Sequence, residues 1–204
     1  MNYIAMLELA SLGAQVLHNR AVELACKMNI PLRVLSSFIE GDGTLVTHNI
    51  KNTPTISGIT VEKQQNVINV LYKQDSIHHH NCWKLLEEHN ISLSTVHWSR
   101  YQDSFLLSFA TSENQAKQII QAIETTIGKD LEHIDSHRGQ ARISIVGVGI
   151  QSSEYVFSAA HHWLMNHDIP ILLSTSSESR FSFHVNEKSA NFIAQELHRL
   201  FHLQ

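Results

Sequence analysis

A pattern that occurs twice restricts the fold of this sequence more than any other feature. The stretch "EEHNISL" returns 78 residues later as "MNHDIPI", and "FLLSFATSENQAKQII" matches "RFSFHVNEKSANFI" at an offset of 74 residues. Similarity at a nearly constant offset indicates a duplicated structural unit. A chain of 204 residues has room for two such units.

The apolar spacing within each unit predicts the same order of elements. In the first unit it predicts strand 68–72, helix 82–89, strands 91–96 and 105–109, helix 116–127 and strand 131–135. In the second it predicts strand 141–149, helix 156–164, strands 169–175 and 181–185 and helix 190–201. Strand–helix–strand–strand–helix–strand is the order of a ferredoxin-like βαββαβ domain. The expected fold class is therefore α+β, with two such domains in tandem.

The second unit lacks its last strand, because the sequence stops at Gln204 directly after the last predicted helix. An unpaired sheet edge is unfavourable, so we expect another segment to fill it. The strand-like stretches "IPLRVLSSF" and "GTLVTH", both between residues 30 and 48, are the natural donors. In that arrangement the first unit is inserted within the second.

Composition limits the classes of function. Hydrophobic residues make up 43% of the chain, and the formal net charge is −4. A nucleic-acid binder usually carries a basic face, so we expect none. The sequence has no apolar run long enough to span a membrane and no secretory signal, and its two cysteines are far apart, so we expect a cytoplasmic protein with reduced thiols.

The first 46 residues carry a more specific signal. "MLELASLGAQVLHNRAVELACKMNIPLRVLSSF" followed by "GTLV" resembles the end of the catalytic domain of aspartate kinases, also called aspartokinases. Later, "PTISGIT", "ARISIVGVGIQSS" and "TSSE" resemble the tandem ACT domains of the same family. The resemblance implies a short helical remnant of the kinase domain in 1–48, which also donates the missing strand, a first ACT domain in 55–137 and a second in 138–204.

The same resemblance implies a regulatory function. Aspartate kinases phosphorylate aspartate with ATP at the start of lysine, threonine and methionine biosynthesis, and their ACT domains bind an end-product amino acid. The implied function is that of a separately made regulatory subunit or of a truncated kinase. The implied partners are an amino-acid effector, lysine or threonine first, and a second copy in a homodimer or a kinase subunit. The alternative is a dimerising scaffold that has lost effector binding.

The catalytic parts of the family are absent from these 204 residues, so we expect no kinase activity from the chain alone and no cofactor in it. ATP would enter only with a joined kinase domain. Where the family has a lysine near ATP, in "GAKVL", this chain has Gln15, followed by Val16. A glutamine cannot supply the positive charge that pairs with phosphate.

The family effector site lies where the loop after the first strand meets the next helix. A helix N-terminus suits a carboxylate, and glycine lets a ligand approach the backbone. Here the loop lacks the usual Pro-Gly in both units, but "TSSE" keeps the family pattern of a hydroxyl and a carboxylate. The effector-binding residues that the resemblance implies are Gln74, Asp75, Ser76, Ile77, His78, His79, Ser94, Trp98, Ser99, Ser176 and Glu178.

The histidines of "SIHHHNCW" admit three interpretations. Consecutive helical residues point about 100° apart, so three in a row cannot converge on one ion. His78 and Cys82 share a helix face but supply only two of the four ligands that structural zinc needs. The other interpretations are solvated histidines at a helix start and polar lining of a modified effector pocket. Cys82, Trp83 and Trp163 are expected to pack in the core, and Trp98 to line the pocket or an interface.

Overall fold

A computed structural model describes residues 1–14, 16–48, 56–73, 76–91, 95–150 and 153–203. The helices are α1 (Tyr3–Ser11), α2 (Asn19–Lys27), α3 (Ser76–Glu88), α4 (Glu113–Ile127), the short 3₁₀ helix η2 (Gly128–Asp130), α5 (Glu154–Asn166) and α6 (Glu187–Leu200). The strands are β1 (Leu32–Val34), β2 (Thr44–Val46), β3 (Gly58–Lys73), β4 (His97–Tyr101), β5 (Ser104–Ser112), β6 (Leu131–Val146), β7 (Leu173–Ser177) and β8 (Arg180–Asn186).

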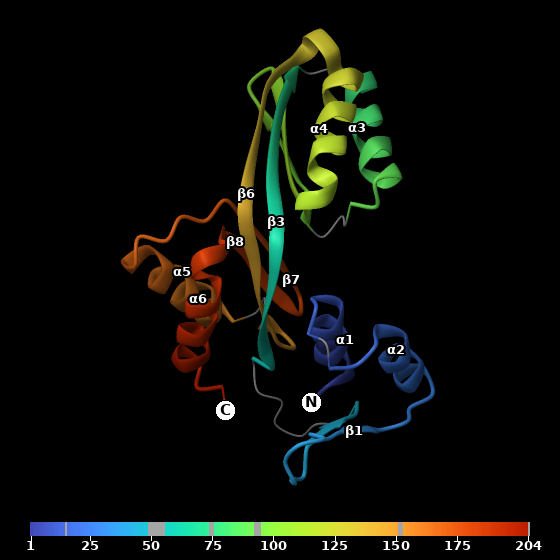
Figure 1. Ribbon diagram of the computed structural model, residues 1–204, viewed down its shortest axis with the longest axis vertical. Helices are drawn as coiled ribbons and strands as arrows, with labels where there is room; N and C mark the ends of the chain where they lie inside the picture. Colours follow the sequence, from blue (N-terminus) through green and yellow to red (C-terminus); the bar gives the residue numbers. More distant parts are fainter. Residues whose placement is uncertain (15, 49–55, 74–75, 92–94, 151–152, 204) are drawn as a thin grey trace.

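One six-stranded antiparallel sheet in the order β4-β5-β3-β6-β8-β7 runs through both units. Its two central strands, β3 and β6, are 16 residues long and each serves both units. One half of the β3–β6 ribbon joins β5 and β4, and the other half joins β8 and β7 (Figure 1). Each half has the ferredoxin-like strand order, so the predicted fold class and the insertion of the first unit within the second are confirmed.

The predicted source of the closing strand of the second unit is wrong. Residues 58–62, at the start of β3, pair with residues 142–146 of β6 and close that sheet. Residues 32–34 and 44–46, which we expected there, form a separate two-stranded sheet, β1–β2. The reason is length, because a 16-residue strand reaches across both units and needs no other donor. The predicted strands 131–135 and 141–149 are likewise parts of the single long strand β6.

The predicted strand 91–96 also differs from the structure. Residues 91, 95 and 96 lie outside any strand, and the strand of this unit, β4, begins at His97. A two-residue turn at Gln102 and Asp103 joins β4 to β5, and Gln102 has φ of 55° there. A tight turn sets the register of a hairpin, so it places the strand at 97–101. Strand β7 similarly begins at Leu173, later than the predicted 169.

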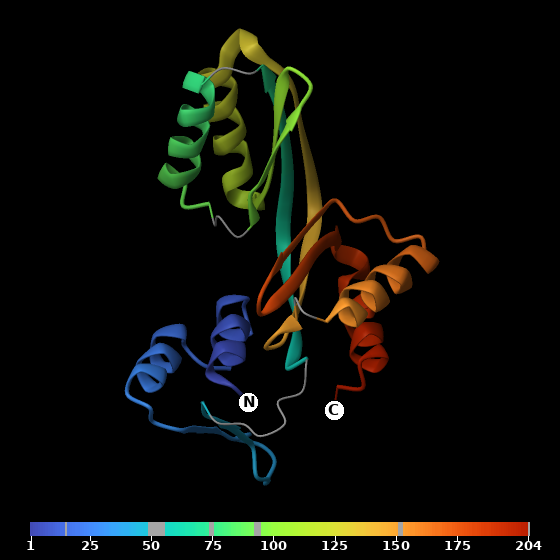
Figure 2. The same ribbon diagram turned by 180° about the vertical axis from the view of Figure 1, so that it is seen from behind.

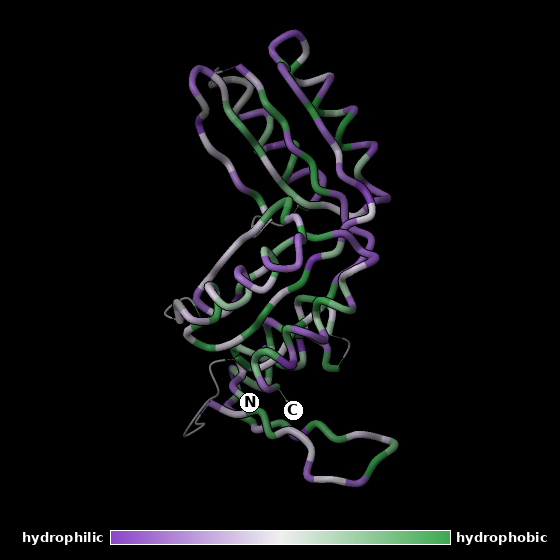
Figure 3. Tube along the Cα trace, turned by 90° about the vertical axis from the view of Figure 1, so that its left-hand side faces the viewer, coloured by the Kyte–Doolittle hydropathy of each residue, from purple (hydrophilic) through white to green (hydrophobic). Residues whose placement is uncertain are grey.

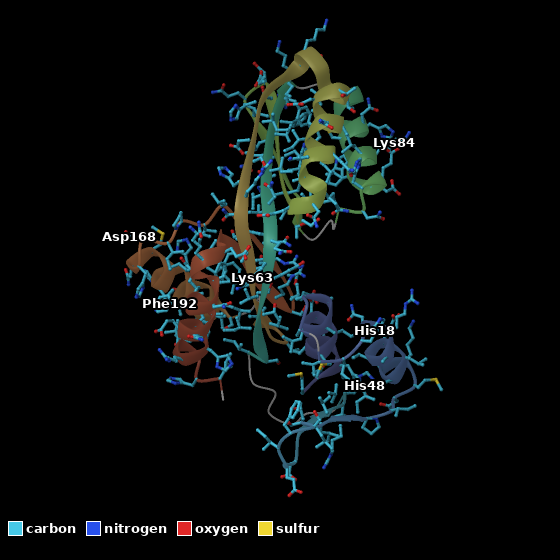
Figure 4. All side chains as sticks on the ribbon, in the orientation of Figure 1. His18, His48, Lys63, Lys84, Asp168 and Phe192 are labelled. Atoms are coloured by element: carbon cyan, nitrogen blue, oxygen red, sulfur yellow. The ribbon has the colours of Figure 1, made fainter. Side chains whose placement is uncertain are left out.

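The helices cover the two halves of the sheet from opposite sides (Figures 1 and 2). Helices α3 and α4 bury one core against β3 and β5, and α5 and α6 bury another against β6 and β8. Lys63 lies on β3 between these two parts (Figure 4), where the pairing of β3 with β6 shifts register between Glu62 and Gln65. Such an irregularity increases the local twist of a ribbon, which fits the change of helix side.

Helices α1 and α2 form a smaller body with the β1–β2 sheet. Tyr3, Met6, Val22 and Val46 are its buried residues, together with Ala25. Helix α1 also contacts the main sheet, because Ala5 and Leu12 pack against Val146 at the end of β6. The small body therefore sits beside the C-terminal end of β6, on the side of the ribbon away from α6 (Figure 1).

Much of the exposed apolar surface belongs to this small body. Among the described residues, nine of the fourteen exposed large hydrophobic side chains lie within residues 1–46. Phe38 is 95% exposed and Ile39 is 75% exposed, in the loop between β1 and β2. Figure 3 shows hydrophobic stretches along the same loop. Exposed apolar patches of this kind are typical of surfaces that contact a partner. None of the helices in the described ranges has the length and apolar character to cross a membrane.

Candidate functional site

A cavity of about 410 Å³ opens in the second unit between the start of α5, the end of β7 and the start of β8. Ser153 lies on its wall as the N-cap residue of α5, and its side chain makes no capping hydrogen bond. The first N–H groups of a helix have no partner within the helix. The cavity therefore lies beside backbone donors of the kind that bind carboxylates.

The polar lining consists of hydroxyl groups and one cation. The hydroxyls belong to Ser153, Ser158, Ser176 and Ser177, and the cation is Arg180. Two of these polar groups are buried without a hydrogen-bond partner in the structure, the Ser177 hydroxyl and Nε of Arg180. Buried polar atoms are normally paired, so unpaired donors at a cavity wall indicate where a ligand or water binds.

The remaining wall is apolar. The rings of Phe157 and Phe181 pack edge to face with centroids 4.8 Å apart, and Ile150 lies beside them. The volume falls within the range of small-molecule sites, and an apolar wall with a few convergent polar groups is the usual composition of such a site. The cavity can hold a molecule with one anionic end and a small apolar or amphipathic body.

Two predicted site residues belong to this unit, and the structure places them differently. Ser176 lines the cavity, next to the Phe181 ring on the neighbouring strand. Glu178 is exposed in the turn between β7 and β8 and does not belong to the cavity wall. Its role as the carboxylate that pairs with an effector remains a prediction.

Most of the predicted residues of the first unit cannot be compared. Gln74, Asp75 and Ser94 lie outside the described residues, as does Gln15. Residues 76–79 form the first turn of α3 as predicted, but the description of the structure does not extend to the side chains of Ser76, Ile77, His78 and His79.

Trp98 and Ser99 lie on β4, which pairs with β5 alone and forms the edge of the sheet. The Trp98 ring is 38% exposed and lies 4.7 Å from the Phe105 ring. Ser99 is half-buried. Val16 is exposed in the turn between α1 and α2, well away from β4 in the chain. Trp98 is thus half covered by its own unit and still available at an edge.

Cys82 is a core residue, as expected. It is 3% exposed among the residues that pack α3 against the sheet, and burial raises the pKa of its thiol to about 11. Burial likewise raises the pKa of Tyr72, its neighbour, to about 12. Trp83 and Trp163 pack against the two cores as expected. Within the described parts of the chain, no three or more His, Cys, Asp or Glu side chains are grouped to hold a metal ion.

Sequence reasoning missed Arg180 and Ser177 as cavity residues. Ser177 lies within the "TSSE" stretch and Arg180 two residues after it. Alternation along β8 places Phe181, Phe183 and Val185 in the core. By the same alternation Arg180 points to the other face of the sheet, which would normally be read as solvent. The signal that could have revealed it is an arginine two residues after a motif already assigned to ligand binding.

The fold defines a class of protein: a tandem pair of ferredoxin-like domains of the ACT type. No family model matches the chain. The aspartokinase of Helicobacter pylori is 31% identical over 211 residues, an alignment that covers 100% of this chain and 52% of the relative. The chain thus spans about half the length of the curated relatives it matches.

Solved structures agree on the fold. Aspartate kinase from Clostridium acetobutylicum has a TM-score of 0.78 at 21% identity, covering 98% of this chain and 48% of that one. The ligand-free regulatory subunit of aspartate kinase from Thermus thermophilus has a TM-score of 0.63 at 17% identity, covering 71% of this chain and 97% of the subunit. The chain is therefore similar in sequence to about half of an aspartokinase and in fold to a regulatory subunit of one, so the expected resemblance is confirmed.

Proposed function

We propose that this chain is the amino-acid-sensing regulatory part of an aspartokinase, and that the cavity at the start of α5 is an effector site. The observation that supports the proposal most is the cavity itself. It combines a helix N-terminus, four serine hydroxyls and an arginine with an apolar wall of two phenylalanines. An α-amino acid carries the matching carboxylate and side chain. Lysine and threonine are the first candidates for the effector, and methionine is the third amino acid to be tested.

The chain regulates rather than catalyses in this proposal, so it needs a catalytic partner. The exposed apolar surface of residues 1–46 is the surface we assign to that partner. A solvated Phe38 and Ile39 are unfavourable unless a second chain or domain covers them. Since the chain spans about half of its curated relatives, the partner proposed is the other half of an aspartokinase, fused or separate. Edge strands β4 and β7 offer a second surface for pairing in a homodimer.

Titration calorimetry with L-lysine, L-threonine and L-methionine tests the effector function. We expect at least one to bind with a dissociation constant below the millimolar range and to raise the melting temperature, because a ligand that binds only the folded state stabilises it. Ser176→Ala should weaken that binding, while the exposed helix residue Met165→Ala should not. Absence of heat up to millimolar concentrations would remove the effector function.

The alternative function is a dimerising scaffold without an effector, which the replacement of the usual Pro-Gly loop in both units favours. In that case none of the twenty amino acids should change the melting temperature.

Co-expression with the N-terminal half of a related aspartokinase tests the partner. We expect kinase activity to appear only when this chain is co-expressed with that half. The same kinase activity with and without this chain would exclude the assignment of the partner.

A further inference from the structure

Arg180 has a second set of contacts, with helix α1. Its Nη1 lies 3.4 Å from Oε2 of Glu8 on α1, and the neighbouring Ser179 hydroxyl donates a 2.7 Å hydrogen bond to Oε1 of the same carboxylate. The side chains of Arg180 and Glu8 are 11% and 23% exposed, respectively. The arginine therefore lines both the cavity at α5 and a groove between α1 and α2.

The guanidinium of Arg180 has an N–H donor without a hydrogen-bond partner in the structure. Its Nη1 faces Glu8, whereas its Nε is buried without a partner and the nearby Ser177 hydroxyl is buried and unpaired as well. A guanidinium has five N–H donors and binds carboxylates best with two of them in parallel. The contact with Glu8, a single long ion pair, leaves this two-donor capacity unused.

We propose that Arg180 couples the cavity to α1: the carboxylate of a cavity ligand takes over the guanidinium, and Glu8 loses its cation. This inference rests on the proposed effector site and names how that site acts. A ligand carboxylate that uses Nε forms a stronger, charge-assisted contact than the present pair. Two carboxylates that share one positive charge repel each other, and each is held less firmly than it would be alone, so occupation of the cavity weakens the attachment of α1.

Helix α1 is positioned to respond. It is a nine-residue helix whose contacts with the main sheet include the Ala5, Leu12 and Val146 cluster, Leu9 beside Gly58 of β3 and the polar contacts of Glu8. A short helix depends on tertiary contacts for its stability. Loss of the Glu8 contact therefore lowers the free energy needed to detach α1 from the sheet, while the sheet keeps its own contacts.

Three variants test the coupling by titration calorimetry with L-lysine, L-threonine and L-methionine. Glu8→Gln removes the competitor of the ligand and should tighten binding about three- to tenfold, the range of a partly buried ion pair. Arg180→Met should weaken binding at least about tenfold, because the ligand loses a charged hydrogen bond. Glu23→Gln lies in the same α1–α2 groove but pairs with Lys27, so it should bind as the wild type does.

Hydrogen exchange of the α1 amides gives a second readout. The bound amino acid should accelerate α1 exchange in the wild type and leave Glu8→Gln, which has already lost the pair, unchanged. Wild-type affinity in Arg180→Met overturns the inference and leaves the effector function standing. If Arg180→Met proves unfolded by circular dichroism, equal affinity of Glu8→Gln and the wild type overturns it.

A simple carboxylate separates this inference from the effector function. If no amino acid binds, the effector function fails, and sodium acetate compared with sodium chloride at equal ionic strength decides the coupling. Acetate should accelerate α1 exchange in the wild type and not in Arg180→Met. The same response in both proteins, or none in either, overturns the inference.

Discussion

The most demanding prediction concerns His184, a buried histidine on β8. It is 1% exposed and lies in a row across the sheet with Arg142 of β6 and Glu62 of β3. Burial and then the charge of Arg142 lower the pKa of the imidazole from 6.5 to about 4, and both ring nitrogens are buried without a hydrogen-bond partner in the structure. The ring is therefore neutral in the folded protein at pH values where the unfolded chain already binds a proton.

The sign and size of the effect follow from this difference. Between pH 6.5 and 4 the unfolded state binds one more proton at this site than the folded state, so stability falls as the pH falls through that range. With these two pKa values, the site costs ~2 kcal/mol at about pH 5 relative to about pH 7.5. Below pH 4 both states are protonated and the loss levels off.

The substitution His184→Leu removes the titrating group and keeps a similar volume. We expect the variant to lie within ~1 kcal/mol of the wild type at neutral pH, since an apolar side chain replaces a polar group in a buried place. Urea denaturation of both proteins at about pH 7.5 and about pH 5 should show that the variant loses ~2 kcal/mol less on acidification than the wild type. His162→Leu, which changes an exposed histidine on α5, serves as the control and should keep the wild-type loss. Equal losses in His184→Leu and the wild type would refute the reasoning.

Two further predictions concern the core and the cooperativity of the fold. The buried Cys82 thiol, with its pKa raised to about 11, should resist a thiol reagent at pH 8 while the half-buried Cys26 reacts, and both should react in urea; rapid labelling of two thiols in the native protein would contradict this. Because β3 and β6 serve both units, Trp163 fluorescence and far-UV circular dichroism of a Trp83→Phe, Trp98→Phe variant should report the same urea midpoint. Two separated midpoints would show independent unfolding.

The repetition of sequence was enough to predict the tandem fold, because the same apolar spacing recurs in both units and one spacing specifies one topology. It could not predict the closing strand of the second unit. That strand and the first strand of the other unit are one continuous segment, and the polar run from Glu62 to Gln65 hides the continuity. Periodicity recognises a strand by its apolar alternation, which a change of covered face interrupts.

The candidate site was predictable only where a local motif coincides with the cavity. Ser176 lines the cavity because the "TSSE" stretch ends a strand beside the helix start, and its contact with an effector stays a prediction. The contact of Arg180 with Glu8 was not predictable, because the two residues are 172 apart in the sequence. Contacts between distant segments leave no trace in spacing. A polar residue on an alternating strand appears solvent-facing until the covering helix is known.

The architecture also determines which part of the molecule can respond to a ligand in the cavity. The first unit is joined to the second through β3 and β6, whose backbone hydrogen bonds continue across the boundary. Changing that junction requires breaking ladder bonds and exposing two cores. Helix α1, by contrast, is attached to the main sheet by a small apolar cluster and by the polar contacts of one carboxylate. A ligand shifts an equilibrium only by its differential affinity for two states. In the coupling that we propose, the binding of an amino acid therefore acts on α1 and not on the shared ribbon.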